Sequence, residues 1–193
     1  DMTGFHVRHF ALLSDGALDA LGVLHAAVEA SGLLPLQVSR LLAGLIDKAC
    51  GGFRPIGIFS PFYRLWACAR RPFADEWLCA NDIPEFATGR NRGPTDVVWR
   101  AAVVGEAAVC GGCPGETVDR TAKTVALSWL WDLVKFYERI SHVSLARRAV
   151  AERAPLFILR VALAAYRSPR ALSIGGRVSR FIRPMCGVVA GCT

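Results

Sequence analysis

The sequence predicts an α+β fold in which helices pack with an antiparallel sheet. Apolar residues recur at helical spacing in several segments, and shorter apolar segments separated by glycine-containing turns are typical of strands. The chain has 193 residues, of which 53% are hydrophobic, so it can fill one core of ordinary size. No internal repeat, low-complexity segment or linker divides it into separately folding parts.

The first predicted element is a helix from Ser14 to Ser31, with Ser14 or Asp15 as its cap and Gly32 as its terminator. Apolar side chains recur along one face: Leu18, Leu21, Leu24 and Val28. His25 lies on or beside this face. We expect it to pack rather than bind a metal, because no histidine or cysteine partner lies at helical spacing.

Two strands are predicted over 36–46 and 53–59, joined by the tight segment 49–52. The two glycines in that segment permit the positive φ angles of a short hairpin turn. Lys48 lies near the tip and Arg54 just past it. Such cations are either solvated turn residues or contacts to a phosphate, and spacing alone leaves both interpretations open.

A helix is predicted to begin at Ser60–Pro61, with the serine as cap and the proline at the first helical position. Pro72 should kink or end this helix. A polar loop over 81–84 leads towards a second helix over 95–109. The Cys110–Cys113 pair is predicted to be a glycine-rich turn rather than a zinc site, because no second pair of ligands follows at suitable spacing.

The segment 124–131 alternates in period two and predicts a strand that ends at Asp132. An aspartate in that place is commonly a turn residue or a helix cap, but a carboxylate at a sheet edge can also bind a hard cation. Beyond it the pattern predicts helices over 145–152 and 155–166, then a hairpin of 170–174 and 177–182 around Gly175–Gly176.

The formal net charge is +7, from 23 basic and 16 acidic residues, which favours a polyanionic partner. No apolar run reaches the eighteen or so residues of a membrane span, so we expect no membrane partner. Seven cysteines at irregular spacing indicate free thiols in a reducing compartment rather than a disulfide framework.

The segment from Trp131 to His142 resembles the first catalytic motif of reverse transcriptases of the non-LTR retrotransposon kind, whose pattern is Asp-x-x-Lys-Ala-Phe-Asp-x-Val-x-His. The matching positions are Asp132, Lys135, Tyr137, Ile140 and His142. Two residues depart from the pattern: Phe136 replaces the usual alanine and Glu138 the second aspartate.

Three further segments resemble motifs of the same family, in the same order. Phe53-Arg54-Pro55-Ile56, followed by Tyr63-Arg64, is similar to the Tyr-Arg-Pro-Ile and Tyr-Lys pair of the fingers. The segment 86–96 is similar to Gly-Phe-x-x-Gly-Arg-Ser-Thr-x-Asp, with looser spacing and without the serine. The segment 187–193 is similar to the start of Gly-Val-x-Gln-Gly-Cys-Pro, with Ala190 in place of glutamine and Thr193 in place of proline.

This resemblance implies a right-hand polymerase fold, with a helical lead-in over 1–35 and a reverse transcriptase domain over 36–193 that contains the fingers and the first part of the palm. It implies RNA-directed DNA synthesis from an RNA template, a DNA primer and dNTPs, with two Mg²⁺ ions. An intracellular site of action is implied too, with the nucleus suggested by analogy alone. The sequence does not indicate an oligomeric state.

The resemblance also assigns roles to individual residues. Asp132 is the expected catalytic carboxylate and, with the carbonyl of Leu133, the expected Mg²⁺ ligand. Tyr137 is expected under the sugar, where its bulk excludes a 2′-hydroxyl. The expected dNTP-binding set is Lys48, Arg54, Leu133, Tyr137, Gly187 and Gly191, and the expected nucleic-acid-binding set is Arg64, Arg90, Arg92 and Lys135.

The second carboxylate motif of such an enzyme contains an Asp-Asp pair, and no such pair occurs in this chain. Since the chain begins with Asp1 and stops inside the last motif, we expect a truncated fragment that is inactive alone, although its parent is an enzyme. The alternative is a decayed domain that binds nucleic acid through its cations without catalysis. A downstream Asp-Asp pair would favour the polymerase.

Overall fold

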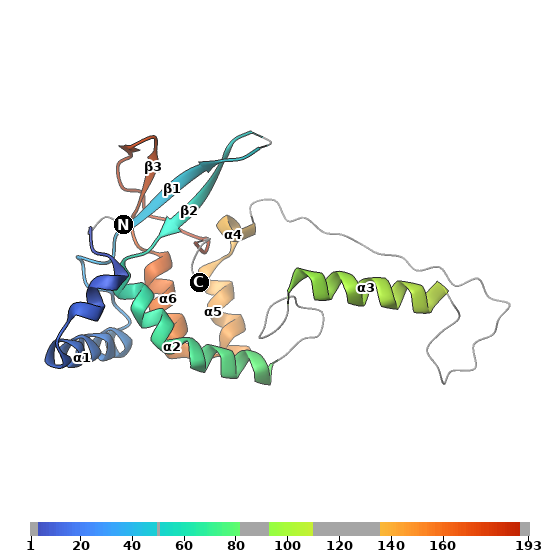
Figure 1. Cartoon of the computed structure of the whole chain (residues 1–193), viewed down its shortest axis with the longest axis horizontal. Helices are drawn as coiled ribbons and strands as arrows, with labels where there is room; N and C mark the ends of the chain where they lie inside the picture. The colour runs from blue at the N-terminus through green and yellow to red at the C-terminus, as the bar shows by residue number, and fades with distance from the viewer. Residues whose placement is uncertain (1–3, 50, 82–92, 110–135, 190–193) are drawn as a thin grey trace. The chain divides into compact units, whose positions relative to one another are not determined.

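The structure is a computed structural model that describes residues 4–49, 51–81, 93–109 and 136–189 (Figure 1). The chain forms two compact units, Asp1–Ala74 with Val134–Thr193, and Asp75–Leu133. The described helices are η1 (Val7–Leu12), α1 (Asp15–Ser31), α2 (Pro61–Ala80), α3 (Pro94–Val109), α4 (Phe136–Arg139), α5 (His142–Ala151) and α6 (Leu156–Tyr166). The described strands are β1 (Leu41–Asp47), β2 (Phe53–Ile58), β3 (Arg170–Ile174) and β4 (Arg177–Val178).

The first unit combines a sheet with helices, which confirms the α+β class. Its strand order is β2-β1-β3-β4. The β1–β2 and β3–β4 pairs are antiparallel, but β1 and β3 run parallel, with Leu42 beside Ala171. The expectation of an antiparallel sheet is therefore wrong at its centre. Parallel neighbours require a long crossover connection, and the chain between β1 and β3 provides one that includes α2, α5 and α6.

Both predicted hairpins are present, although the last strand, β4, ends at Val178 instead of residue 182. At the tip of β1–β2 the Lys48 N–H donates to the carbonyl oxygen of Gly52 over 3.0 Å, and Gly52 has a φ of +82°. Gly175 and Gly176 have φ angles of +53° and +78° between β3 and β4. The first strand begins at Leu41 instead of residue 36, because the preceding segment forms a turn closed by hydrogen bonds to the Pro35 carbonyl oxygen.

The ends of α1 follow the sequence prediction. The Ser14 hydroxyl accepts a hydrogen bond from the Ala17 N–H, and Gly32 ends the helix in the left-handed region at φ +68°. His25 is buried and its Nε2 lies 3.3 Å from the Phe62 carbonyl oxygen, so the prediction that it packs is confirmed.

Of the two effects expected of Pro72, a kink or the end of the helix, the second is not observed, because α2 continues through Pro72 to Ala80. Near its middle, α2 is attached to α1 by a polar contact. The Trp66 indole donates to Glu29 Oε1 over 2.7 Å, and Arg70 Nη2 donates to Glu29 Oε2 over 3.2 Å. Helix α3, in the second unit, agrees with the predicted range.

The core of the first unit lies between the sheet and helices α1, α2 and α6, which Figure 1 shows gathered on one side of the sheet. It consists of Val28, Leu41, Phe59, Phe62, Tyr63, Trp66, Val161, Ala165 and Val189. Val189 belongs to the segment that resembles the last polymerase motif, so this residue of the segment is part of the core. None of the helices within the described ranges is long and apolar enough to span a bilayer.

Candidate functional site

Two segments far apart in the sequence are joined by backbone hydrogen bonds. The Gly187 N–H donates to the carbonyl oxygen of Ile140, and the Val188 N–H donates to that of Tyr137, each over 2.8 Å. One segment belongs to the motif around Asp132 and the other to the motif that begins at Gly187. The structure therefore brings Tyr137 and Gly187, two predicted nucleotide-binding residues, into one place.

Only glycine fits at position 187. Its φ is +87°, and a Cβ added there would lie 2.8 Å from the Glu138 carbonyl oxygen and 3.0 Å from that of Tyr137. These contacts are with backbone atoms, which cannot move aside as a flexible side chain can. The close approach that requires glycine at position 187 is therefore to the backbone of helix α4.

The side chain of His142 contacts the same segment at Gly187. Its ring is buried, and Nε2 lies 2.7 Å from the carbonyl oxygen of Gly187. Because a carbonyl oxygen only accepts, Nε2 must carry the proton. In the neutral ring Nδ1 then accepts from Arg167 Nε, over a long 3.5 Å. The sequence interpretation placed His142 in the motif but gave it no role in the site.

Val189 packs the segment onto the sheet. A Cβ built on Gly57 would lie 1.8 Å from Val189 Cγ1, so the valine side chain occupies the space that any other residue at position 57 would need. Gly57 lies in β2, directly after the segment 53–56 that resembles a fingers motif. A glycine within a strand, such as Gly57, is visible in the sequence and indicates close packing at that position. The sequence does not indicate that Val189 is the residue that packs there.

The predicted cations are accessible. Lys48, Arg54 and Arg64 are exposed, and within the described residues their side chains make no hydrogen bond or ion pair. Arg54 and Gly57 are three residues apart in one strand, so Arg54 lies on the sheet face opposite to the one that Val189 covers. The exposure of these cations does not show what they bind, so contacts of Lys48 and Arg54 with a dNTP stay predictions.

Tyr137 is 54% exposed as a whole residue, and its backbone carbonyl group is held by Val188. The adjacent carbonyl oxygen of Glu138 accepts a hydrogen bond from the Cys186 thiol, over 3.3 Å. A half-exposed aromatic residue whose backbone is held by one neighbouring segment, 186–188, is suited to packing against a flat ligand group.

A half-buried cation, Arg170, lies in the same unit. Arg170 Nη2 donates to the Tyr166 carbonyl oxygen over 2.7 Å, whereas Arg170 Nε is buried without a partner among the described residues. Burial lowers the pKa of this guanidinium from its ordinary value, and the nearby Cys186 sulfur opposes that shift.

Six predicted site residues lie outside the described residues: Asp132, Leu133, Lys135, Arg90, Arg92 and Gly191. The predicted strand 124–131 and the Cys110–Cys113 turn lie outside them too. Within the described ranges, no group of three His, Cys, Asp or Glu side chains is placed to hold a metal ion. The metal site thus stays a prediction.

A scan of the sequence against protein-family models finds no match. A search of curated proteins also finds no similar sequence. The functional interpretation therefore depends on the motifs and on the contacts described above.

Proposed function

We propose that this chain is the fingers and first part of the palm of a reverse transcriptase-like polymerase of the non-LTR retrotransposon kind, which performs RNA-directed DNA synthesis in its intact parent protein. The observation that carries the proposal is the pairing of Gly187 and Val188 with Ile140 and Tyr137. Two segments were assigned to one nucleotide site by motif alone, and they are hydrogen-bonded neighbours.

In the proposed site, the backbone around Gly187 and the ring of Tyr137 form two sides of the place for the sugar and base of a dNTP. His142 holds the Gly187 carbonyl group, so that neither side moves when the nucleotide binds. The aromatic side chain at position 137 would favour a deoxyribonucleotide, because a 2′-hydroxyl would meet the ring.

Asp132 and the carbonyl of Leu133 would hold Mg²⁺, since a carboxylate and a carbonyl oxygen are the hard donors that this ion prefers. When bound, the metal stabilises the negative charge that develops at the reacting phosphate. The proposed partners of the cations are the triphosphate for Lys48 and Arg54, and the template strand for Arg64, Arg90, Arg92 and Lys135. Forked donors suit arginine to both kinds of phosphate.

Primer extension on an RNA template with Mg²⁺ and dNTPs tests the proposal, using a longer form of the chain that includes the expected Asp-Asp motif. We expect extension by that form, loss of extension in Asp132→Ala, and unchanged extension in Asp19→Ala. Asp19 is a matched control because it is an exposed carboxylate on α1, remote in sequence from every motif.

A second candidate function is nucleic-acid binding without catalysis. The observation that favours it is the exposure of Lys48, Arg54 and Arg64, which make no ion pair with any described residue. Binding of a template–primer duplex by the longer form, with no extension under any condition, would favour this function and contradict the polymerase.

A further inference from the structure

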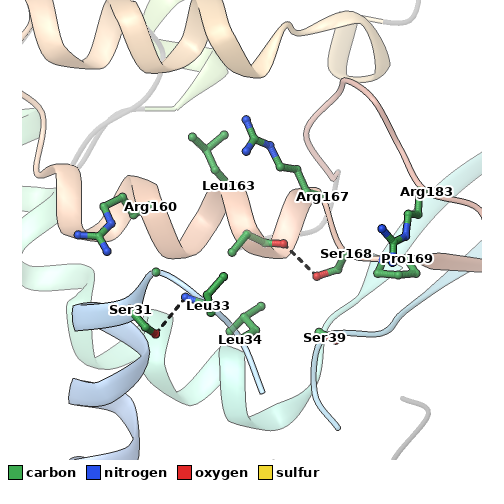
Figure 2. A pocket seen from close by; sticks show the side chains of 12 residues that line it. Ser31, Leu33, Leu34, Ser39, Arg160, Leu163, Arg167, Ser168, Pro169 and Arg183 are labelled. Atoms are coloured by element: carbon green, nitrogen blue, oxygen red, sulfur yellow. Dashed lines mark hydrogen bonds between the residues drawn. The ribbon is translucent and has the colours of Figure 1, made fainter. Parts of the chain in front are cut away.

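A pocket of about 500 Å³ opens between the loop after α1, the end of α6 and the segment after β4 (Figure 2). Three arginines from separate places line it: Arg160 in α6, Arg167 just after α6, and Arg183 beyond β4. No aspartate or glutamate of the described chain is among its lining residues. The pocket is therefore a concentration of positive charge without internal neutralisation, which favours an anionic ligand.

The three arginines differ in how much of their hydrogen-bonding capacity is used. Arg160 Nη2 donates to the Ala30 carbonyl oxygen at the end of α1, over 3.0 Å. Arg167 uses only its Nε, towards His142, so its terminal nitrogens have no partner within the described residues. The Arg183 side chain makes no hydrogen bond or ion pair with any residue in the described ranges. Arg167 and Arg183 thus hold the free donors.

The serine hydroxyls of the pocket are already used as donors. Ser31 donates to the Val28 carbonyl oxygen, Ser39 to that of Leu36 and Ser168 to that of Ala164. A hydroxyl has one proton to donate, so these side chains have only acceptor capacity left. An anion in this pocket would therefore be held by the guanidinium groups.

Among the residues that the structure describes, the lining contains no aromatic side chain, although aromatic rings are the usual platform on which a nucleobase stacks. Its apolar part comes from aliphatic residues, such as Leu33, Leu34 and Leu163. The pocket thus has the donors for a phosphate group and lacks the platform for a base. This combination suits the backbone of a nucleic acid strand better than a free nucleotide.

We propose that this pocket binds a backbone phosphate of a single-stranded nucleic acid through Arg167 and Arg183. The choice of ligand rests on the proposed function, but the pocket is separate from the residues assigned there to the template and the dNTP. The forked guanidinium groups match the oxygens of a phosphodiester. Arg167 also contacts His142, which holds Gly187, so the pocket and the candidate nucleotide site share one connecting side chain.

The test is binding of a fluorescently labelled single-stranded RNA to the full chain, measured by anisotropy over a range of salt concentrations. We expect Arg183→Gln to weaken binding about tenfold, which corresponds to one charge-assisted hydrogen bond. The slope of log K against log salt should fall by about 0.7 for each phosphate that the variant no longer neutralises. Arg183 is the better target, because replacing Arg167 would also disturb His142.

Arg177→Gln is the matched control, because this substitution removes the same charge from an exposed residue of β4 that lies outside the pocket. It should stay within about twofold of the unchanged protein, since a remote surface charge is largely screened. An RNA analogue with an uncharged methylphosphonate backbone should bind Arg183→Gln and the unchanged protein equally.

Equal affinities of Arg183→Gln and Arg177→Gln would overturn the pocket proposal, whether or not the longer form extends a primer. If Arg183→Gln alone loses RNA affinity and the longer form does not extend a primer, the pocket proposal is supported and the polymerase proposal is contradicted. An Arg183→Gln effect that persists with the uncharged analogue would contradict phosphate as the ligand.

Discussion

The carbonyl oxygen of Tyr137 accepts a 2.8 Å hydrogen bond from the N–H of Val188. With the bond from the Gly187 N–H to Ile140, it forms a short backbone pairing at the centre of the candidate site. His142 and Val189 flank this pairing, one by a hydrogen bond to Gly187 and the other by packing on Gly57. Substitutions at these positions report whether the pairing holds the unit together.

Gly187→Ala should destabilise the chain by about 2–4 kcal/mol, because it adds backbone overlap to the cost of a left-handed alanine. Gly176→Ala is the matched control: its φ is +78°, but nothing lies within 4 Å of the added Cβ. The free energy of unfolding of Gly176→Ala should fall by only about 1–2 kcal/mol. Urea denaturation of both variants measures the difference, and equal losses would show that Gly187 does not approach α4 closely.

Gly57→Ala should lower the free energy of unfolding by about 1–3 kcal/mol, because the added Cβ would overlap with Val189 Cγ1. Val189→Ala removes the overlapping methyl groups, so the double variant should be more stable than the sum of the two single losses predicts. The expected coupling free energy is about 1 kcal/mol or more. Strict additivity in the denaturation cycle would mean that the two residues do not touch.

His142→Phe keeps a ring beside Tyr166 but leaves the buried carbonyl oxygen of Gly187 without its donor. We expect a loss of about 1–3 kcal/mol in the free energy of unfolding. Val143→Ala, at an exposed position of the same helix, should change it by less than about 0.5 kcal/mol. If His142→Phe is as stable as Val143→Ala, the hydrogen bond contributes nothing.

Stability should fall on acidification in two stages. Burial lowers the pKa of His25 from 6.5, so the unfolded chain takes up this proton more readily, and stability is lost as the pH falls below about 6.5. The hydrogen bond from Arg70 lowers the pKa of Glu29 from 4.5, so a second loss follows below about 4.5. Both shifts have the same sign, since each favours the deprotonated form in the folded chain.

Denaturation midpoints measured between pH 8 and pH 3 separate the two stages. His25→Gln should flatten the first stage and leave the second, while Glu29→Gln should do the reverse. A midpoint that does not change between pH 7 and pH 5 in the unchanged protein would contradict the assignment of the first stage to His25.

Tyr137→Ala tests the proposed nucleotide site in the longer form of the chain. Removal of the ring should raise the use of ribonucleotides relative to deoxyribonucleotides by about tenfold or more, because the bulk that excludes the 2′-hydroxyl is gone. Tyr137→Phe keeps that bulk and should discriminate as the unchanged protein does. If Tyr137→Ala, Tyr137→Phe and the unchanged protein discriminate equally between ribonucleotides and deoxyribonucleotides, Tyr137 does not contact the sugar.

Several local features could be predicted because each depends on a few neighbouring residues. Ser14 and Gly32 specify the two ends of α1 through their own backbone preferences and one side-chain hydrogen bond. The two glycine turns specify their hairpins for the same reason. The continuation of α2 through Pro72 was not predictable in this way, because packing of the helix on α1 offsets a local cost.

The sequence by itself determined the class of fold, the places of most helices, both hairpins and the two segments that form the candidate site. Only the tertiary structure decided that β1 and β3 pair in parallel, that His142 and Val189 fix Gly187 in place, and that Arg167 and Arg183 line one pocket. Caps and turns are set by short-range backbone energies. These contacts depend instead on how distant segments fill shared space, which no local pattern encodes.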